Sequence, residues 1–179
     1  MIIFRLIQIK QPHSQDEFIQ IYQLNYQTFV EEIPQHMRNE NRVLVDKFHS
    51  RNNYLIAKKE EQVIGMVCYC TERPFSLDHK LKDLDDYLPS YSKIAEVRLL
   101  SIKPENRNGK LAYDMLKALC SELIRQGIDS AVISGTIRQL PLYKKLGFKA
   151  FGPLVGTQDA AYQPMFITTK QLRSDFRSN

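Results

Sequence analysis

AEVRLLSIKPENRNGKLAYDMLKALCSELIRQG, residues 95–127, is the stretch that decides the fold. Its start, Glu96–Ile102, is an apolar-rich run typical of a strand, and a polar turn follows at 103–110. Apolar residues then recur at spacings of three and four, which predicts an amphipathic helix: Leu111, Ala112, Met115, Leu116, Leu119, Cys120, Leu123 and Ile124. Gly127 is suited to the left-handed C-cap of this helix.

The polar turn between this strand and helix is suited to bind a phosphate. The first turn of a helix carries backbone N–H groups without intrahelical partners, and the helix dipole adds positive charge there. Arg107 and Lys110 contribute two cationic side chains. The sequence therefore predicts an anion site at the start of the helix.

The turn resembles the pyrophosphate-binding motif of the GNAT acyltransferase superfamily, Arg/Gln-x-x-Gly-x-Gly/Ala. Arg107 and Ala112 match the motif. Lys110 stands where the first glycine belongs, and Gly109 lies one place earlier.

A second motif resembles the same superfamily. Leu142–Phe148, LYKKLGF, is similar to the Leu-Tyr-x-x-Leu-Gly-Phe signature that closes its cofactor site. Thr136 and Gln139 replace the usual Asn and Ala upstream of the tyrosine. The resemblance covers Tyr54–Phe151 and implies an α+β GNAT fold, with a mixed central sheet of about seven strands flanked by helices.

The predicted elements outside this stretch agree with such a fold. Pro34 ends a helix that begins at Ser14, where Glu17 completes a capping box. The other predicted elements are a strand at Ile2–Ile9, a short helix at Arg38–Lys47, strands at 54–58, 63–70 and 128–134, a helix at 138–146, and an antiparallel hairpin of 148–154 with 162–168.

Length and composition predict one soluble globular domain spanning residues 1–179. The 43% hydrophobic and 25% charged fractions are ordinary, and no apolar run approaches the ~20 residues of a membrane span. The three cysteines, Cys68, Cys70 and Cys120, form no disulfide framework and are expected to be buried thiols. We therefore expect a cytoplasmic protein.

Charge is distributed unevenly along the chain. Residues 1–97 carry 12 Lys and Arg against 14 Asp and Glu, whereas residues 98–179 carry 13 against 6. A polyanionic cofactor accounts for this basic half, and nucleic acid is the competing explanation. No nucleic-acid motif is present, and Asp83, Asp85 and Asp86 lack metal-ligand spacing, so neither nucleic acid nor a metal is expected.

The segment Tyr26–Glu32 partly resembles the first helix of autoinducer synthases and long-chain N-acyl amino acid synthases. In these GNAT relatives the segment reads Arg-x-x-Val-Phe-x-x-Glu, and here Asn25 or Gln27 stands in place of the arginine. The alternative is an amphipathic helix with core aromatic residues. We expect its apolar residues to fill the space that a long acyl chain would need: Phe18, Ile21, Tyr22, Phe29 and Ile33.

The resemblance implies acyl transfer from a thioester to an amine, with acetyl-CoA as the simplest donor. In the family, one strand edge pairs with the pantetheine arm and the following turn holds the pyrophosphate. The implied cofactor-binding residues are Leu100, Ser101, Ile102, Arg107, Asn108, Gly109, Lys110, Leu111, Ala112 and Tyr143.

Glu96 and Tyr143 are the candidate catalytic residues. Glu96 matches the family's carboxylate base and would accept the proton of the ammonium, although an ion pair with Arg98 is an equal alternative. Tyr143 would protonate the leaving thiolate, and its alternative is a core tyrosine. Arg98 and Arg138 are candidate substrate contacts, and an exposed helix-start arginine is the alternative for Arg138.

Three functions are consistent with these residues. The first is a GNAT-type N-acetyltransferase acting on a small-molecule primary amine. The second keeps the fold but uses a longer acyl chain, carried by coenzyme A or by an acyl carrier protein as partner. The third is a non-catalytic acyl-CoA-binding module. Neither the acceptor amine nor the oligomeric state can be read from the sequence.

Overall fold

The computed structural model describes residues 6–88, 93–158 and 160–177. Contacts divide the chain into two compact units: Met1–Cys68 with Leu99–Ala118, called unit 1, and Tyr69–Arg98 with Leu119–Asn179, called unit 2. Because the chain passes between the units several times, β3, β4 and α2 contribute residues to both.

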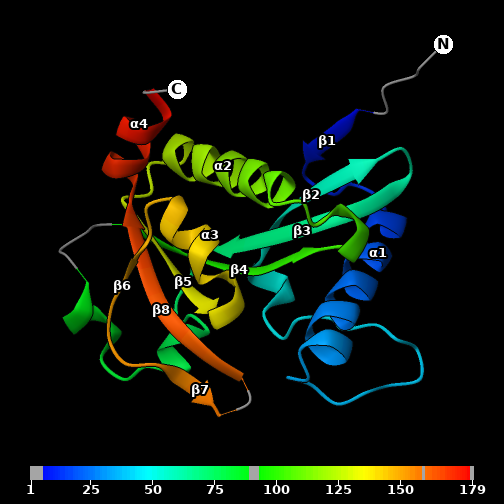
Figure 1. Cartoon of the computed structure of the whole chain (residues 1–179), viewed down its shortest axis with the longest axis horizontal. Helices are drawn as coiled ribbons and strands as arrows, with labels where there is room; N and C mark the ends of the chain where they lie inside the picture. The colour runs from blue at the N-terminus through cyan, green and yellow to red at the C-terminus, as the bar shows by residue number, and fades with distance from the viewer. Residues whose placement is uncertain (1–5, 89–92, 159, 178–179) are drawn as a thin grey trace. The chain divides into compact units, whose positions relative to one another are not determined.

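The strands form a mixed sheet, which confirms the predicted α+β class (Figure 1). Hydrogen bonds join them in the order β1-β2-β3-β4-β5-β8-β6, and β7 also pairs with β8. The described residues contain eight strands, one more than the predicted seven or so: β1 (Ile7–Lys10), β2 (Asn53–Lys59), β3 (Gln62–Cys70), β4 (Ile94–Ile102), β5 (Ser130–Thr136), β6 (Lys149–Ala150), β7 (Val155–Thr157) and β8 (Ala160–Thr168).

In the part of the chain that the structure describes, four α-helices and several shorter helical segments accompany the sheet. The α-helices are α1 (Gln15–Tyr26), α2 (Lys110–Arg125), α3 (Leu140–Lys145) and α4 (Thr169–Arg177). A π-helix, η1 (Gln27–Glu32), continues α1, and the 3₁₀ segments are η2 (His49–Arg51), η3 (Leu77–His79), η4 (Leu84–Tyr87), η5 (Pro104–Asn106) and η6 (Ile137–Gln139).

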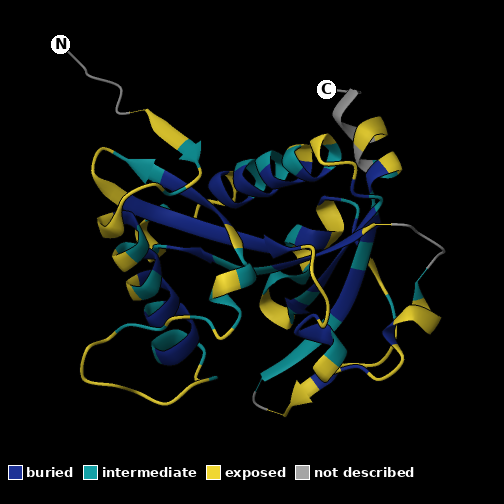
Figure 2. Cartoon of the chain, turned by 180° about the vertical axis from the view of Figure 1, so that it is seen from behind, coloured by how far each residue is buried: buried dark blue, intermediate teal, exposed yellow. Residues whose placement is uncertain are grey.

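Unit 1 packs α1 against a buried strand face. Ser14 and Glu17 form the predicted capping box at the start of α1. Figure 2 shows β3 buried over nearly its whole length. Gly65 of β3 lets α2 approach closely, because a Cβ there would lie 2.8 Å from the Met115 sulfur. One apolar cluster of this unit contains Ile21, Leu24, Tyr54, Ile56, Val63, Met66 and Cys68, with Phe18, Tyr22 and Leu99 against it.

Unit 2 takes part of its core from the polar segment 72–93. Its aspartates Asp83, Asp85 and Asp86 are typical of a solvated acidic loop, part of which can be helical, but four of its apolar side chains are buried. Phe75, Leu77, Leu81 and Leu84 pack with residues of β4, β5 and β7. Acidic neighbours hide this apolar spacing in the sequence.

The predicted short helix at Arg38–Lys47 is wrong, because the segment is irregular. Arg42 has a φ of 52°, which no helix accommodates. The Asn39 side chain donates to the Val43 carbonyl at 2.9 Å, and such local bonds compete with helical ones.

The C-terminal hairpin is divided, and one helix was not predicted. Gly152 has a φ of 61° and Pro153 has no N–H, so only β6 forms within the expected strand at 148–154. The short strand β7 follows it, and both are antiparallel to β8. Helix α4 follows β8 directly, and no helix was predicted there. Part of the predicted strand Ile2–Ile9 lies outside the described residues, and β1 begins at Ile7.

Candidate active site

The predicted phosphate turn in unit 1 connects β4 to α2 through η5. The Asn108 side chain accepts hydrogen bonds from the backbone N–H groups of Lys110 at 3.1 Å and Leu111 at 3.5 Å, and thereby caps the helix. Gly109 has a φ of 82°, a conformation that strongly favours glycine. Gly109 therefore provides the backbone freedom that the motif obtains from a glycine at the next position, which is Lys110 here.

Two backbone donors of the turn remain unpaired. Within the described residues, the N–H groups of Gly109 and Ala112 have no hydrogen-bond acceptor. A Cβ built on Gly109 would meet nothing within 4 Å, so the space beside Gly109 is open. Unpaired N–H groups at a helix N-terminus with open space beside them fit a phosphate.

Arg107 and Lys110 of the turn already have partners in the protein. The Arg107 guanidinium donates to both carboxylate oxygens of Glu32 at 2.7 Å, and its Nε donates to the Ile102 carbonyl at 2.7 Å. Lys110 pairs with Asp114 one helical turn along α2. The positive charge of the turn is therefore partly compensated by Glu32 and Asp114.

Leu99 interrupts the regular conformation of β4. Parallel pairing with β5 covers Ile94–Val97, and Leu99 then adopts a φ of 57°. A residue other than glycine in this region stores about 1–3 kcal/mol of strain, and such strain is concentrated at functional sites. The irregular position lies immediately before Leu100, Ser101 and Ile102, the residues predicted to contact the pantetheine arm.

Glu96 is almost completely buried in unit 2, at 1% exposure. Its carboxylate accepts hydrogen bonds from the backbone N–H groups of Ser76 and Leu77, both at 2.8 Å. The Arg98 Nε lies 3.8 Å from the same carboxylate. Burial raises the pKa of Glu96 above its usual value, and the charge of Arg98 and the two amide donors oppose that rise.

Tyr143 of α3 is also buried, and its ring lies against β5. A Cβ on Gly135 would lie 3.1 Å from this ring, so glycine permits the close approach. The Phe148 ring contacts it edge-on at 5.9 Å between centroids. Within the described part of the chain the Tyr143 hydroxyl makes no hydrogen bond to another protein group. Burial raises the pKa of Tyr143 above its usual value.

The predicted site residues therefore fall into two groups. The phosphate turn and Leu100–Ile102 belong to unit 1, whereas Glu96, Arg98, Arg138 and Tyr143 belong to unit 2. Arg138 lies on η6, next to α3. Sequence reasoning missed Glu32, Ser76, Leu77 and Gly135, which hold the predicted residues in place. No local pattern connects them to those residues.

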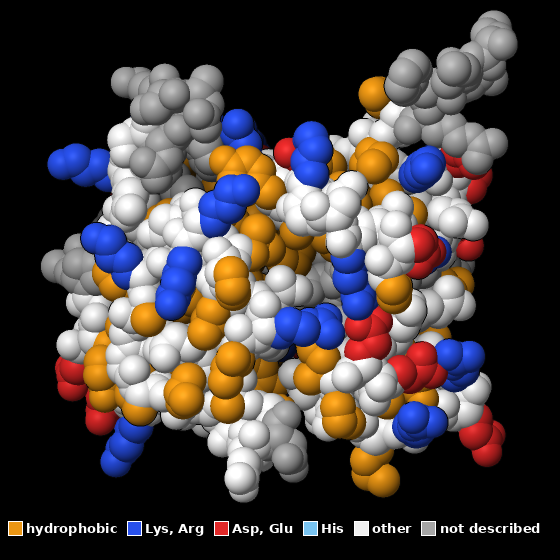
Figure 3. Space-filling model, viewed as in Figure 1, with side chains coloured by type: hydrophobic (Ala, Val, Ile, Leu, Met, Phe, Trp, Pro, Cys, Tyr) orange, Lys and Arg blue, Asp and Glu red, His pale blue; other side chains and the backbone are white. Residues whose placement is uncertain are grey.

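The surface carries no single concentration of positive charge on the face shown in Figure 3. Lys and Arg side chains are scattered there among hydrophobic and polar groups. In residues 6–88, 93–158 and 160–177, no three His, Cys, Asp or Glu side chains gather to hold a metal ion. None of the helices in these ranges has the length and apolar character to cross a membrane. The three cysteines are buried thiols, and burial raises the pKa of Cys120 to about 12.

Comparison with known families identifies the class of protein. Residues 18–148 match the Acetyltransferase (GNAT) family, which covers most of the chain, so the chain belongs to this family. The predicted acyltransferase enzyme is confirmed by this membership. A comparison with curated protein sequences gives no match.

Solved structures share the fold at low sequence identity. A CoA-dependent acyl-homoserine lactone synthase, BjaI, with SAM and isopentyl-CoA, is 19% identical over 94% of this chain and 87% of its own, with a TM-score of 0.79. FeeM, an N-acyl amino acid synthase from uncultured soil microbes, is 14% identical over 94% of each chain (TM-score 0.75). An acyl-CoA N-acyltransferase from Pseudomonas aeruginosa is 14% identical over 90% and 99% (TM-score 0.63).

Proposed function

We propose that the chain transfers an acetyl group from coenzyme A to a small-molecule primary amine in the cytoplasm. The observation that carries this proposal is the pair of unpaired N–H groups, Gly109 and Ala112, at the start of α2. Together with family membership, they support a site for the pyrophosphate of coenzyme A. Bound coenzyme A supplies the acyl group as a thioester.

The turn binds the pyrophosphate of coenzyme A, and the edge of β4 orients the pantetheine arm. Gly109 and Ala112 donate to a phosphate oxygen, and Arg107 adds charge when it turns from Glu32 toward the phosphate. Backbone groups of Leu100–Ile102 pair with the pantetheine arm. A backbone N–H next to the irregular position at Leu99 polarises the acyl carbonyl and stabilises the negative charge that develops on its oxygen.

Glu96 and Tyr143 move the protons. The amine must lose a proton before it attacks, and the Glu96 carboxylate accepts that proton, directly or through one water molecule. The raised pKa of Glu96 makes it a stronger base than an exposed glutamate. As the new N–C bond forms and the C–S bond breaks, the Tyr143 hydroxyl protonates the leaving sulfur. Arg98 and Arg138 are the proposed contacts for a charged group of the acceptor.

The packing of α1 favours a short acyl group. Ile21 and Leu24 are buried in the apolar cluster of unit 1, and Phe18 and Tyr22 pack against it, so these side chains fill volume that a long acyl chain would need. Phe29 is also buried. This supports acetyl-CoA as the donor.

A longer acyl donor is the second candidate, because BjaI and FeeM have this fold and their names specify a CoA-dependent lactone synthase and an N-acyl amino acid synthase. The carrier of such a donor would be coenzyme A or an acyl carrier protein. An acidic carrier would be attracted to the basic half of the chain, with a rate that falls as salt is raised.

A donor competition distinguishes these candidates. Acetyl-CoA, a long-chain acyl-CoA and a long-chain acyl carrier protein are offered together with a panel of amines, and acylamide products are counted at low and high salt. We expect acetylated product to predominate at both salt concentrations. Preference for the acyl carrier protein that is lost at high salt would replace the first candidate with the second.

A further inference from the structure

The two amides that bind Glu96 follow a backbone position that an ion pair of unit 2 holds in place. Asp78 accepts a hydrogen bond from the Phe75 backbone N–H at 2.6 Å, and the amides of the next two residues are the ones that bind Glu96. The Arg73 guanidinium forms a fork with Asp78: its Nε donates to Oδ2 at 3.1 Å, and its Nη2 donates to Oδ1. Arg73, Asp78 and the Phe75 amide therefore form one connected network directly before the amides of the Glu96 carboxylate.

The segment that carries these amides is fixed by further contacts on both sides of the fork. The Arg73 Nη1 donates to Asp85 Oδ1 at 2.6 Å, and the guanidinium lies over the Phe75 ring, 5.6 Å from its centroid. Phe75 and Leu77 are buried in the apolar core of unit 2. Side chains in a closely packed core hold defined positions. The backbone between Phe75 and Leu77 therefore has little freedom to turn its amides away while the fork is intact.

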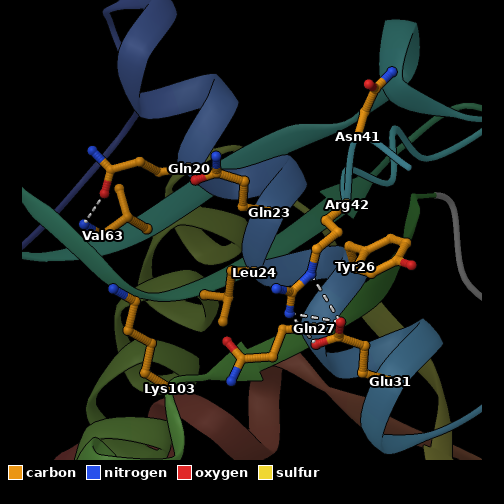
Figure 4. Close-up of a pocket in the computed structure, with 10 residues that line it drawn as sticks. All are labelled: Gln20, Gln23, Leu24, Tyr26, Gln27, Glu31, Asn41, Arg42, Val63 and Lys103. Atoms are coloured by element: carbon orange, nitrogen blue, oxygen red, sulfur yellow. Dashed lines mark hydrogen bonds and ion pairs between the residues drawn. The ribbon is translucent and has the colours of Figure 1, made fainter. Parts of the chain in front are cut away.

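Two exposed arginine forks elsewhere in the chain join side chains only. Arg42 forms one with Glu31 at a polar hollow of unit 1, as Figure 4 shows. Arg125 forms the other with Glu122 at the end of α2. Within the described ranges, neither carboxylate accepts a hydrogen bond from a backbone N–H. The Asp78 carboxylate differs from both, because it connects an arginine to the backbone that binds a candidate catalytic residue.

We propose that Arg73 and Asp78 are positioning residues for Glu96, an inference that rests on the proposed function. The fork fixes the backbone so that both amides point at the carboxylate oxygens. Hydrogen bonds from these amides orient the carboxylate and stabilise its charged form, which is the form that accepts the proton of the amine. Arg73 and Asp78 thus act on the reaction through the backbone.

Other groups around Glu96 act on its charge directly. The Arg98 Nε lies 3.8 Å away on the same strand, and the charge of Lys80 also opposes the rise in the pKa of Glu96. The register partner of Glu96 on β5 is Val132, which carries no charge. These neighbours remain when the fork is removed, so variants of Arg73 report on the two amides.

Arg73→Met tests the positioning role through the pH dependence of kcat/KM. Less firmly held amides stabilise the carboxylate less, so the rising limb of the profile should move to higher pH. At a pH below the wild-type midpoint, kcat/KM should fall about tenfold, the effect of weakening one hydrogen bond to a charged group. On the plateau above the limb it should change less than about twofold. A variant that had only lost part of its folded population would lose the same factor at every pH.

The titration of Glu96 is also measured directly and without substrate, by ¹³C NMR of the glutamate carboxyl groups. The Glu96→Gln variant identifies the resonance by its absence. In Arg73→Met the Glu96 midpoint should move to higher pH by the same amount as the kinetic limb. Asp78→Asn should move both midpoints in the same direction, and it provides the second variant if Arg73→Met is not folded in urea denaturation.

Two control variants separate the fork from its charge. Arg125→Met removes the same charge and the same kind of fork from an exposed position of unit 2, and should leave both midpoints unchanged. Arg73→Lys keeps the positive charge but cannot reproduce the planar fork. It should show most of the shift of Arg73→Met.

The outcomes separate this inference from the proposed function. Unmoved midpoints in folded Arg73→Met would overturn the inference. A move to lower pH would also overturn it, because the fork would then exclude water from the carboxylate instead of holding its amides. Full recovery in Arg73→Lys would assign the effect to charge and overturn it as well. A Glu96 midpoint that moves while the kinetic limb stays would instead contradict the proposed function of Glu96 as the base.

Discussion

The two groups of candidate site residues differ in their burial and in how far along the chain their partners lie. The phosphate turn is exposed, and most of its contacts are local: Asn108 caps its own helix and Lys110 pairs with Asp114. Glu96 and Tyr143 are buried, and Glu96 is bound by amides about 20 residues earlier in the chain. An exposed turn can determine affinity, whereas buried ionisable groups with perturbed pKa values are candidates for proton transfer. Variants in the two groups should therefore affect different kinetic constants.

The largest effect is expected in the buried group, from Tyr143→Phe. The phenylalanine ring keeps the contacts with Phe148 and Gly135, so only the hydroxyl is lost. General acid catalysis contributes ~10²–10⁴-fold, so kcat should fall by about this factor. Affinity for coenzyme A should change little. Steady-state kinetics with calorimetry check both values, and wild-type turnover would make Tyr143 a core residue only.

Glu96→Gln should produce the next largest effect and should change the pH profile. The wild-type kcat/KM should rise with pH through a pKa above the usual value of a glutamate, because burial raises the pKa of the base. In the variant, kcat/KM should no longer rise with pH through this pKa, and its value should be ~10²-fold lower. Persistence of the limb would assign it to another group, such as the acceptor amine.

The same variant has a stability effect of known sign. The folded state binds the Glu96 proton more tightly than the unfolded state, so the contribution of this group to stability falls as pH rises between the two pKa values. Glutamine supplies only one acceptor oxygen for the Ser76 and Leu77 amides. One buried N–H is then unpaired, at a cost of about 1–3 kcal/mol in the free energy of unfolding at neutral pH. Urea denaturation measures this cost.

Gly109→Val should weaken the binding of coenzyme A without slowing the acyl-transfer step. Its side chain would meet no protein atom, but a φ of 82° strains a β-branched residue, so the turn should shift and move its N–H groups. We expect about tenfold weaker binding of coenzyme A for a strain of 1–2 kcal/mol. Gly127→Val is the matched control, because Gly127 also has a positive φ of 71° and open space, but lies beyond the other end of α2. Gly127→Val should lower the free energy of unfolding without weakening the binding of coenzyme A.

The smallest effect is expected from Glu32→Gln. This change releases Arg107 from a half-exposed ion pair, and such pairs contribute about 0–1 kcal/mol. Coenzyme A should bind up to about fivefold more tightly, and the gain should diminish at high salt. Glu122→Gln, which releases Arg125 at the end of α2, is the charge-matched control and should leave affinity unchanged. Weaker binding in Glu32→Gln would show that the ion pair holds the turn in its binding conformation.

The same comparison explains what could be predicted from sequence. The strand, turn and helix at 95–127 follow from local periodicity and from Gly109 and Gly127, and the structure confirms them. The partners of Glu96 could not be predicted, because Ser76 and Leu77 lie in a segment whose acidic residues conceal its buried side chains. The Arg107–Glu32 pair was also missed, since it joins residues 75 positions apart. The turn follows from the local sequence, whereas the surroundings of the Glu96 carboxylate depend on tertiary packing.

The central claim is that the start of α2 holds the pyrophosphate of coenzyme A. The most direct measurement is ¹H–¹⁵N NMR of the labelled chain during titration with coenzyme A, with the Gly109 and Ala112 amides as reporters. We predict that these two resonances move downfield and saturate together with the calorimetric binding curve. Binding of coenzyme A with both resonances unmoved would contradict the claim and place the cofactor elsewhere.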